Sequence, residues 1–132
     1  MENRKNIEKP EILLTEWVTR LGLNDWTIRL ETNVIPSDMI TQDTDGEVEF
    51  TECNKSAVVR ILNEKCYGKR ITPFDFERIL IHELLHLKFC LLVDDGMQGR
   101  FVHQILDDMA KALVSAKRGT TTVGSVTCSE GE

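Results

Sequence analysis

Ile81-His82-Glu83-Leu84-Leu85-His86-Leu87 is the stretch of sequence that decides the fold, because it sets two imidazoles and a carboxylate in an otherwise apolar segment. On an α-helix, His82 and His86 are one turn apart, so their rings project from the same face. Glu83 lies about 100° further around the helix axis. Apolar neighbours cover most of the circumference, which is typical of a helix that runs through the centre of a domain.

The polar groups of this motif need partners if the helix is buried. Burial of two histidines and an ionised carboxylate without compensation is strongly unfavourable. A Zn²⁺ ion with its bound water satisfies all three, and H-E-x-x-H is the spacing of two zinc ligands with a general base beside them. We therefore predict His82 and His86 as metal ligands and Glu83 as the catalytic base. The alternative is a pair of core histidines bonded to backbone carbonyls.

Composition limits the class of protein. The 132 residues predict one domain over residues 1–117 and a disordered Thr-, Gly- and Ser-rich tail over residues 118–132. Four cysteines without C-x-x-C spacing, and no apolar signal core among the first residues, favour reduced thiols in the cytoplasm. No apolar run is long enough to span a membrane. A net charge of −6 without a Lys/Arg cluster argues against a nucleic-acid partner.

The first half of the chain predicts one helix and a small sheet. A helix begins at Pro10 and stops at Gly22, with apolar residues at helical spacing between them. Alternating apolar and polar residues then predict strands over residues 26–31, 47–51 and 57–62. Because the later connections are short, we expect a three-stranded antiparallel sheet.

The second half predicts two helices, so that the fold class is α+β. The motif helix is expected over residues 73–92, with Thr72 as its N-cap. A last helix is expected over residues 98–116. Its apolar stripe is predicted to contain Phe101, Ile105, Met109, Ala112, Leu113 and Ala116.

A catalytic zinc site needs a third protein ligand, which the motif does not supply. His103, the remaining histidine, lies near the start of the last helix and at the edge of its apolar stripe, so we predict it as that ligand. Asp94, Asp95 and Asp107 are the rival donors. Asp107, one turn after His103, is also a candidate acceptor that fixes the tautomer of an imidazole.

These features resemble the minimal zincin metallopeptidases, gluzincin-like in layout, that are often encoded in phage and prophage genomes. The likeness spans residues 10–116, but its specific part is His82-Glu83-Leu84-Leu85-His86, and the regions 23–26 and 104–106 are looser likenesses. The resemblance implies hydrolysis of a peptide bond by zinc-bound water, with one Zn²⁺ ion on the two motif histidines and Glu83 as general base. The implied partner is a protein or peptide substrate.

The chain departs from that family in its third ligand. Gluzincins take a Glu from the later helix, whereas here His103 stands just before Gln104. Three neutral imidazoles would leave the site more cationic and its water more acidic. SprT-like proteases, which have a later third His, are a second resemblance, but the zinc ribbon and basic tail of those proteins are missing.

Two functions compete. The first is an active peptidase whose third strand offers a backbone edge to an extended substrate. The second is a catalytically silent, zinc-stabilised interaction or regulatory module of phage origin. Glu83 favours the enzyme, because a structural site has no use for an acid between its ligands. Tyr67 is an oxyanion candidate or a plain loop residue, and Cys128 is a candidate zinc latch or a solvated tail cysteine.

Overall fold

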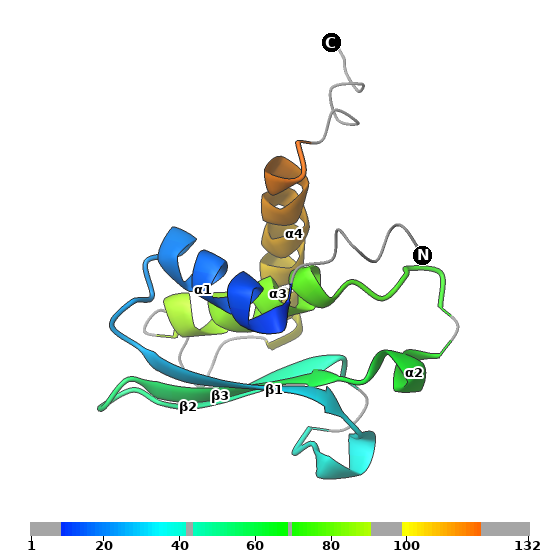
Figure 1. Ribbon diagram of the computed structural model, residues 1–132, viewed down its shortest axis with the longest axis horizontal. Coiled ribbons are helices and arrows are strands. Elements are labelled where there is room, and N and C mark those ends of the chain that lie inside the picture. Colours follow the sequence, from blue (N-terminus) through cyan, green and yellow to red (C-terminus); the bar gives the residue numbers. More distant parts are fainter. Residues whose placement is uncertain (1–8, 42–43, 69, 91–98, 120–132) are drawn as a thin grey trace.

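The fold is an α+β arrangement in which three helices lie on one face of a small sheet (Figure 1). The structure is a computed structural model of the chain and describes residues 9–41, 44–68, 70–90 and 99–119. The helices of this layer are α1 (Pro10–Arg20), α3 (Phe76–Lys88) and α4 (Gly99–Lys117). The α+β class predicted from the sequence is therefore confirmed.

The sheet is mixed, so the prediction of a purely antiparallel sheet was wrong. Its strands are β1 (Thr27–Val34), β2 (Gly46–Thr51) and β3 (Ser56–Leu62), and they lie in the order β1-β3-β2. The hairpin between β2 and β3 makes that pair antiparallel, with Val48 opposite Val59. β3 then inserts between β2 and β1, and it runs parallel to β1. The short connection between β2 and β3 predicts their antiparallel pairing. It does not predict which strand β1 pairs with.

Helix α3 is the centre of the fold, as its apolar circumference predicted. It packs against α1, α4, β2 and β3. Its buried apolar side chains are Ile79, Leu80, Ile81, Leu84, Leu85 and Leu87. The helix begins at Phe76, not at residue 73, because the Asp75 carboxylate accepts a hydrogen bond from the Arg78 amide at 3.2 Å and acts as the N-cap. It ends at Lys88, earlier than predicted.

Helix α4 packs on the core through a face that only partly matches the predicted stripe, of which Met109 and Leu113 contact the core. Leu106, Ala110 and Val114 are buried against the main core, whereas Phe101 and Ile105 are 54% and 58% exposed. The sequence carries two overlapping apolar stripes one residue apart, and spacing alone does not rank them. Within the described residues, no helix is long and apolar enough to cross a bilayer.

Two short elements lie between the segments for which helices and strands were predicted. A 3-10 turn covers Pro36–Asp38, and α2 covers Glu64–Tyr67. The Asn63 side chain caps α2 by accepting a hydrogen bond from the Lys65 amide at 2.8 Å.

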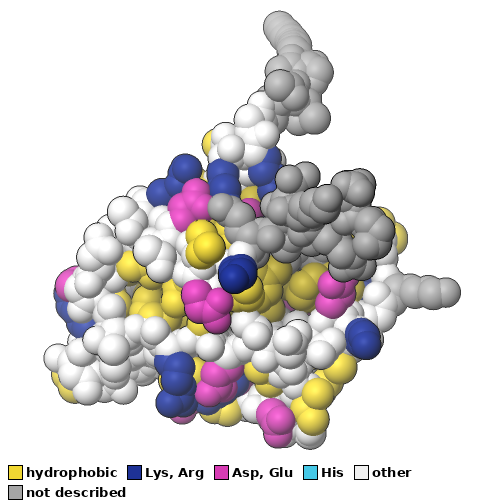
Figure 2. All heavy atoms as spheres, in the orientation of Figure 1, with side chains coloured by type: hydrophobic (Ala, Val, Ile, Leu, Met, Phe, Trp, Pro, Cys, Tyr) yellow, Lys and Arg dark blue, Asp and Glu magenta, His cyan; other side chains and the backbone are white. Residues whose placement is uncertain are grey.

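Figure 2 shows hydrophobic side chains gathered in a band between the helix layer and the sheet, on the face seen in Figure 1. The core thus reaches the surface along this band.

A buried carboxylate joins the ends of all three helices of the layer. Glu77, on α3, is 7% exposed and accepts hydrogen bonds at 2.6 Å from Trp17 Nε1 on α1 and from Lys117 Nζ on α4. Lys117 also donates to Glu16 at 2.9 Å. Burial alone would raise the pKa of Glu77, but the hydrogen bonds from Lys117 and Trp17 outweigh it and hold the pKa below its ordinary value of 4.5.

We expect Glu77→Gln to lower the free energy of unfolding by about 2 kcal/mol at pH 7, because the largely buried Lys117 loses its ion pair with Glu77. A carboxylate with a depressed folded-state pKa stabilises the fold above its unfolded pKa, and this stability is lost as the pH falls through the folded value. The difference between the two proteins should therefore shrink below pH 4.5.

Urea denaturation at pH 7 and at acid pH measures both effects. The matched control is Glu16→Gln, which removes a partly exposed carboxylate from the same lysine and should cost less. A constant difference across this pH range would contradict the role of the Glu77 charge.

Candidate metal centre

Three histidines meet beside the core. His82 and His86 come from α3 and His103 comes from α4, and one ligand nitrogen from each lies within 4.8 Å of the others. Nε2 of His82 and Nδ1 of His103 are 3.3 Å apart. In the described part of the chain these residues form a group that can hold a metal ion. The three ligands predicted from sequence are thus brought together.

The fold positions these rings by two means. The spacing of His82 and His86 is set locally by one turn of α3. His103 is set by packing, because Leu106 of α4 joins the same core cluster as Leu85 of α3. The Arg78 guanidinium also donates to Asp107 at 2.8 Å, which ties the two helices together one turn from the rings.

Asp107 lies beside the His82 ring and does not belong to the group of three histidines that can hold an ion. Its Oδ1 atom is 3.6 Å from Nδ1 of His82 and accepts the hydrogen bond from Arg78, while its Oδ2 atom is 3.2 Å from Lys111 Nζ. A carboxylate beside Nδ1 favours the tautomer with its proton on Nδ1, which leaves Nε2 free for an ion. The other rival donors, Asp94 and Asp95, fall outside the described residues.

Burial keeps the motif histidines neutral. It lowers the pKa of His86 to about 4, with the neighbouring His82 and His103 lowering it further. It also lowers the pKa of His82, although the nearby Asp107 carboxylate opposes the shift. Because an ion binds the unprotonated imidazole, His82 and His86 are in the binding form at neutral pH.

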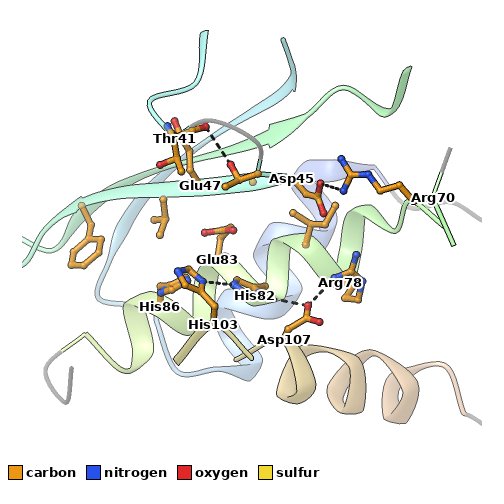
Figure 3. Close-up of a pocket in the computed structure, with 15 residues that line it drawn as sticks. Thr41, Asp45, Glu47, Arg70, Arg78, His82, Glu83, His86, His103 and Asp107 are labelled. Carbon is orange, nitrogen blue, oxygen red and sulfur yellow. Dashed lines mark hydrogen bonds and ion pairs between the residues drawn. The ribbon is translucent and has the colours of Figure 1, made fainter. Parts of the chain in front are cut away.

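Glu83 lies between the histidines and strand β2 (Figure 3). The side chain is almost completely buried. Burial, with the Glu47 and Asp45 carboxylates nearby, raises its pKa to about 8. A cation bound to the histidines would lower the pKa of Glu83 and so favour its ionised form. The negative charge of Glu83 would then partly balance the positive charge of the ion.

A cleft of about 410 Å³ opens over this group. One wall is α3 with its two motif histidines and Glu83, and another is β2, through Gly46, Val48 and Phe50. A cleft of this volume is of the size that binds small ligands and short segments of chain. The histidine group therefore faces a space that another molecule can enter.

Tyr67 does not present its hydroxyl to the cleft as the oxyanion prediction required. The ring is 7% exposed, in a small second core with Val34, Met39 and Leu62. Its hydroxyl donates to the Thr72 carbonyl at 2.6 Å. The simpler alternative, a loop tyrosine at the surface, does not fit either, because the ring is buried. Cys128, the candidate latch, falls outside the described residues.

The sequence did not reveal three residues that shape the cleft. Arg70 and Arg78 line it. Arg70 lies outside the motif helix, but Arg78 is one turn before His82 on α3, so the helical spacing could have indicated its place. Gly46 lines it as well. A Cβ atom there would lie 2.7 Å from Ile79 Cγ2 and 3.2 Å from Glu83 Oε2. The strand therefore approaches the motif helix more closely than any side chain allows.

We expect Gly46→Ala to lower the free energy of unfolding by about 1–3 kcal/mol, because the methyl group overpacks the contact between β2 and α3. Urea denaturation measures the loss. Adding Ile79→Leu removes the Cγ2 methyl group nearest to the new atom and should recover part of the stability. An unchanged stability in Gly46→Ala would show that the strand can move away at no cost.

Comparison with known proteins adds no relative. No protein-family model matches the chain, and neither a curated protein nor a solved structure is significantly similar to it. The likeness to zincin metallopeptidases thus stays a prediction from the motif and the order of elements.

Proposed function

We propose that this protein is a zinc-dependent peptidase. The observation that carries the proposal is the position of Glu83, a buried carboxylate at the same cleft as three converging histidines. A site that only holds a metal needs donors and no further acid. A hydrolytic site needs a base beside an open coordination position, which is the arrangement that three donors and one free carboxylate provide.

The donor set fits zinc. Three neutral imidazoles are a common ligand set of catalytic zinc, and they leave one position open. Two nitrogens bound tetrahedrally at the usual Zn–N distance are about 3.3 Å apart. His82 Nε2 and His103 Nδ1 have this separation, and all three donor atoms lie within 4.8 Å of one another. Zinc bound there would supply the Lewis acidity that makes water a nucleophile near neutral pH and polarises a carbonyl group.

Glu83 has the role of general base in this proposal. Its carboxylate takes a proton from the attacking water and passes it to the leaving amine. Because Gly46 has no side chain, strand β2 lies close to Glu83. A Cβ atom at position 46 would be 3.2 Å from the Glu83 Oε2 atom. Substrate backbone held along β2 would therefore lie within reach of the base.

Strand β2, and not β3, is suited to bind an extended substrate. β3 pairs with β1 on one side and β2 on the other, so the hypothesis that the third strand offers an edge was wrong. β2 pairs with β3 on one side and has no other strand partner among the described residues. It also lines the cleft. A peptide can add to such a free edge through backbone hydrogen bonds.

Removal and return of the metal test the proposal. We expect the purified protein to cleave an unfolded protein or a peptide mixture, to lose this activity in a chelator, and to regain it when one equivalent of Zn²⁺ is added. Mass spectrometry of the products reports the cleaved bonds. A zinc-loaded protein that cleaves none of these substrates would instead support the alternative, a metal-stabilised module that binds a partner.

A further inference from the structure

The two ends of the cleft differ in chemistry. Gly46 lies against Ile79 and Glu83, and the residue before it, Asp45, accepts a hydrogen bond from Arg70 at 2.7 Å. Phe50 lines the cleft about 13 Å further along β2, at the strand spacing of about 3.3 Å per residue. Figure 3 shows Arg70 and Arg78 on the side of the cleft away from His86. One end is therefore basic and the other apolar.

The basic end continues into a second hollow. This hollow has a volume of about 550 Å³ and shares Arg70, Arg78 and His82 with the cleft. Lys111 of α4 lines it as well. A substrate that lies along β2 and passes the histidines would therefore extend into a space bordered by three cationic side chains.

These cations exceed the carboxylates that pair with them. Asp45 pairs with Arg70, and Asp107 is shared between Arg78 and Lys111. The balance is three cations to two carboxylates. This local excess contrasts with the net charge of −6 on the whole chain. An anionic group is thus attracted to this end of the cleft.

The pairing of the arginines is also incomplete. Arg78 donates through Nη1 to Asp107, and its buried Nε atom has no acceptor among the described residues. Arg70 is 44% exposed and Lys111 is 53% exposed, so solvent and ligands reach both. A carboxylate that enters the hollow would reach the exposed cationic groups of Arg70 and Lys111, whereas the Arg78 Nε atom is buried and out of its reach. Hydrogen bonds between ionised groups are the strongest of their kind.

We propose that the end of the cleft formed by Arg70, Arg78 and Lys111 is a substrate subsite for a carboxylate group. The proposal rests on the peptidase function and names its substrate class: peptides with an acidic group on one side of the cleaved bond. The group is an acidic side chain or the C-terminal carboxylate of a short peptide. The apolar end, at Val48 and Phe50, accepts a hydrophobic residue on the other side of the bond.

The test compares matched peptides. Each carries an aromatic residue on one side of a central bond and Asp, Asn or Lys on the other, and each is made with a free and with an amidated C-terminus. Cleavage by the zinc-loaded wild-type protein gives kcat/KM. Binding to zinc-loaded Glu83→Gln protein, followed by fluorescence anisotropy, reports on the subsite without cleavage. The two forms of the C-terminus separate a side-chain carboxylate from a terminal one.

We expect the peptide with the carboxylate to be favoured about tenfold over its Asn or amidated counterpart, in cleavage and in binding. The preference should weaken with added salt. Arg70→Gln and Lys111→Gln should each reduce it to about twofold, since each removes one exposed cation from the subsite. Arg29→Gln is the matched control, because it removes an arginine that is 69% exposed and pairs with Glu31 on β1.

The outcomes separate the two proposals. Cleavage without a carboxylate preference overturns the subsite and leaves the peptidase function standing. Carboxylate-dependent binding without any cleavage supports the subsite and overturns the peptidase function. A preference that survives both subsite variants, or that Arg29→Gln removes equally, overturns the assignment to Arg70 and Lys111.

Discussion

We expect one zinc ion to co-purify with each chain, and replacing His82 with alanine should remove it and destabilise the protein. If the three histidines hold an ion as proposed, loss of His82 leaves His86 on α3 and His103 on α4 as its remaining donors. Metal that binds only the native state stabilises it by about 2.7 kcal/mol at a concentration one hundred times Kd, and this stabilisation would be lost. His103→Ala should act as strongly, because His103 is an equal member of the group. Elemental analysis and thermal unfolding measure the two effects.

Two neighbours on α4 provide controls. Asp107→Asn keeps all three donors but removes the charge beside His82 Nδ1, so the affinity for zinc should fall by about 10–100-fold without complete loss. Gln104→Ala, an exposed position next to His103, should change neither zinc content nor stability. If Asp107→Asn released the metal and His103→Ala kept it, Asp107 would be the ligand. A wild-type protein that folds without bound metal would remove the basis of the site.

Glu83→Gln is expected to reduce hydrolysis by about 10²–10⁴-fold while zinc content stays the same. The amide has nearly the same shape as the carboxylate but cannot accept the proton of the attacking water. Because Glu83 does not belong to the ligand group, the histidines should still hold the ion. The initial rate of peptide cleavage, with zinc content and circular dichroism measured on the same samples, separates loss of the base from loss of the fold.

The matched control for this substitution is Glu64→Gln, which makes the same chemical change at an exposed position on α2. It should leave the rate unchanged. Equal rates for wild-type and Glu83→Gln proteins would exclude Glu83 as the base. The cleft with its three histidines would then be better explained as a metal-binding interaction site.

The sequence predicted what depends on neighbours along the chain. One turn of helix separates His82 from His86, and this spacing alone aligns the two rings. The end of α1 near Gly22 was equally local, since that glycine has a φ of 71° and stops the helix where the pattern indicated. The start of α3 was missed by a few residues. Thr72 and Asp75 are both good caps, and Asp75 is held in addition by Arg118, the residue after α4.

Features that depend on distant segments could not be predicted from the pattern. The alternation in residues 26–31 predicts a strand, but it contains no information on whether that strand pairs with residues 46–51 or 56–62. His103 was proposed because a third ligand was needed, and only packing of α4 on α3 brings it to the motif. Helix α4 also shows the limit of periodicity, because Ile105 and Leu106 are both apolar and the structure buries only Leu106.

The tie between Lys117 and Glu16 spans 101 residues of sequence, almost the whole described chain. During synthesis, the N-terminal helix, the sheet and α3 leave the ribosome before α4, which carries Leu106, Ala110 and Val114 of the core. The apolar surface that these residues cover stays open to water until residues 99–117 have emerged, and domains generally fold as units. A nascent chain that stalls before α4 would present this surface to chaperones, and the core can close only after residues 99–117 have been made.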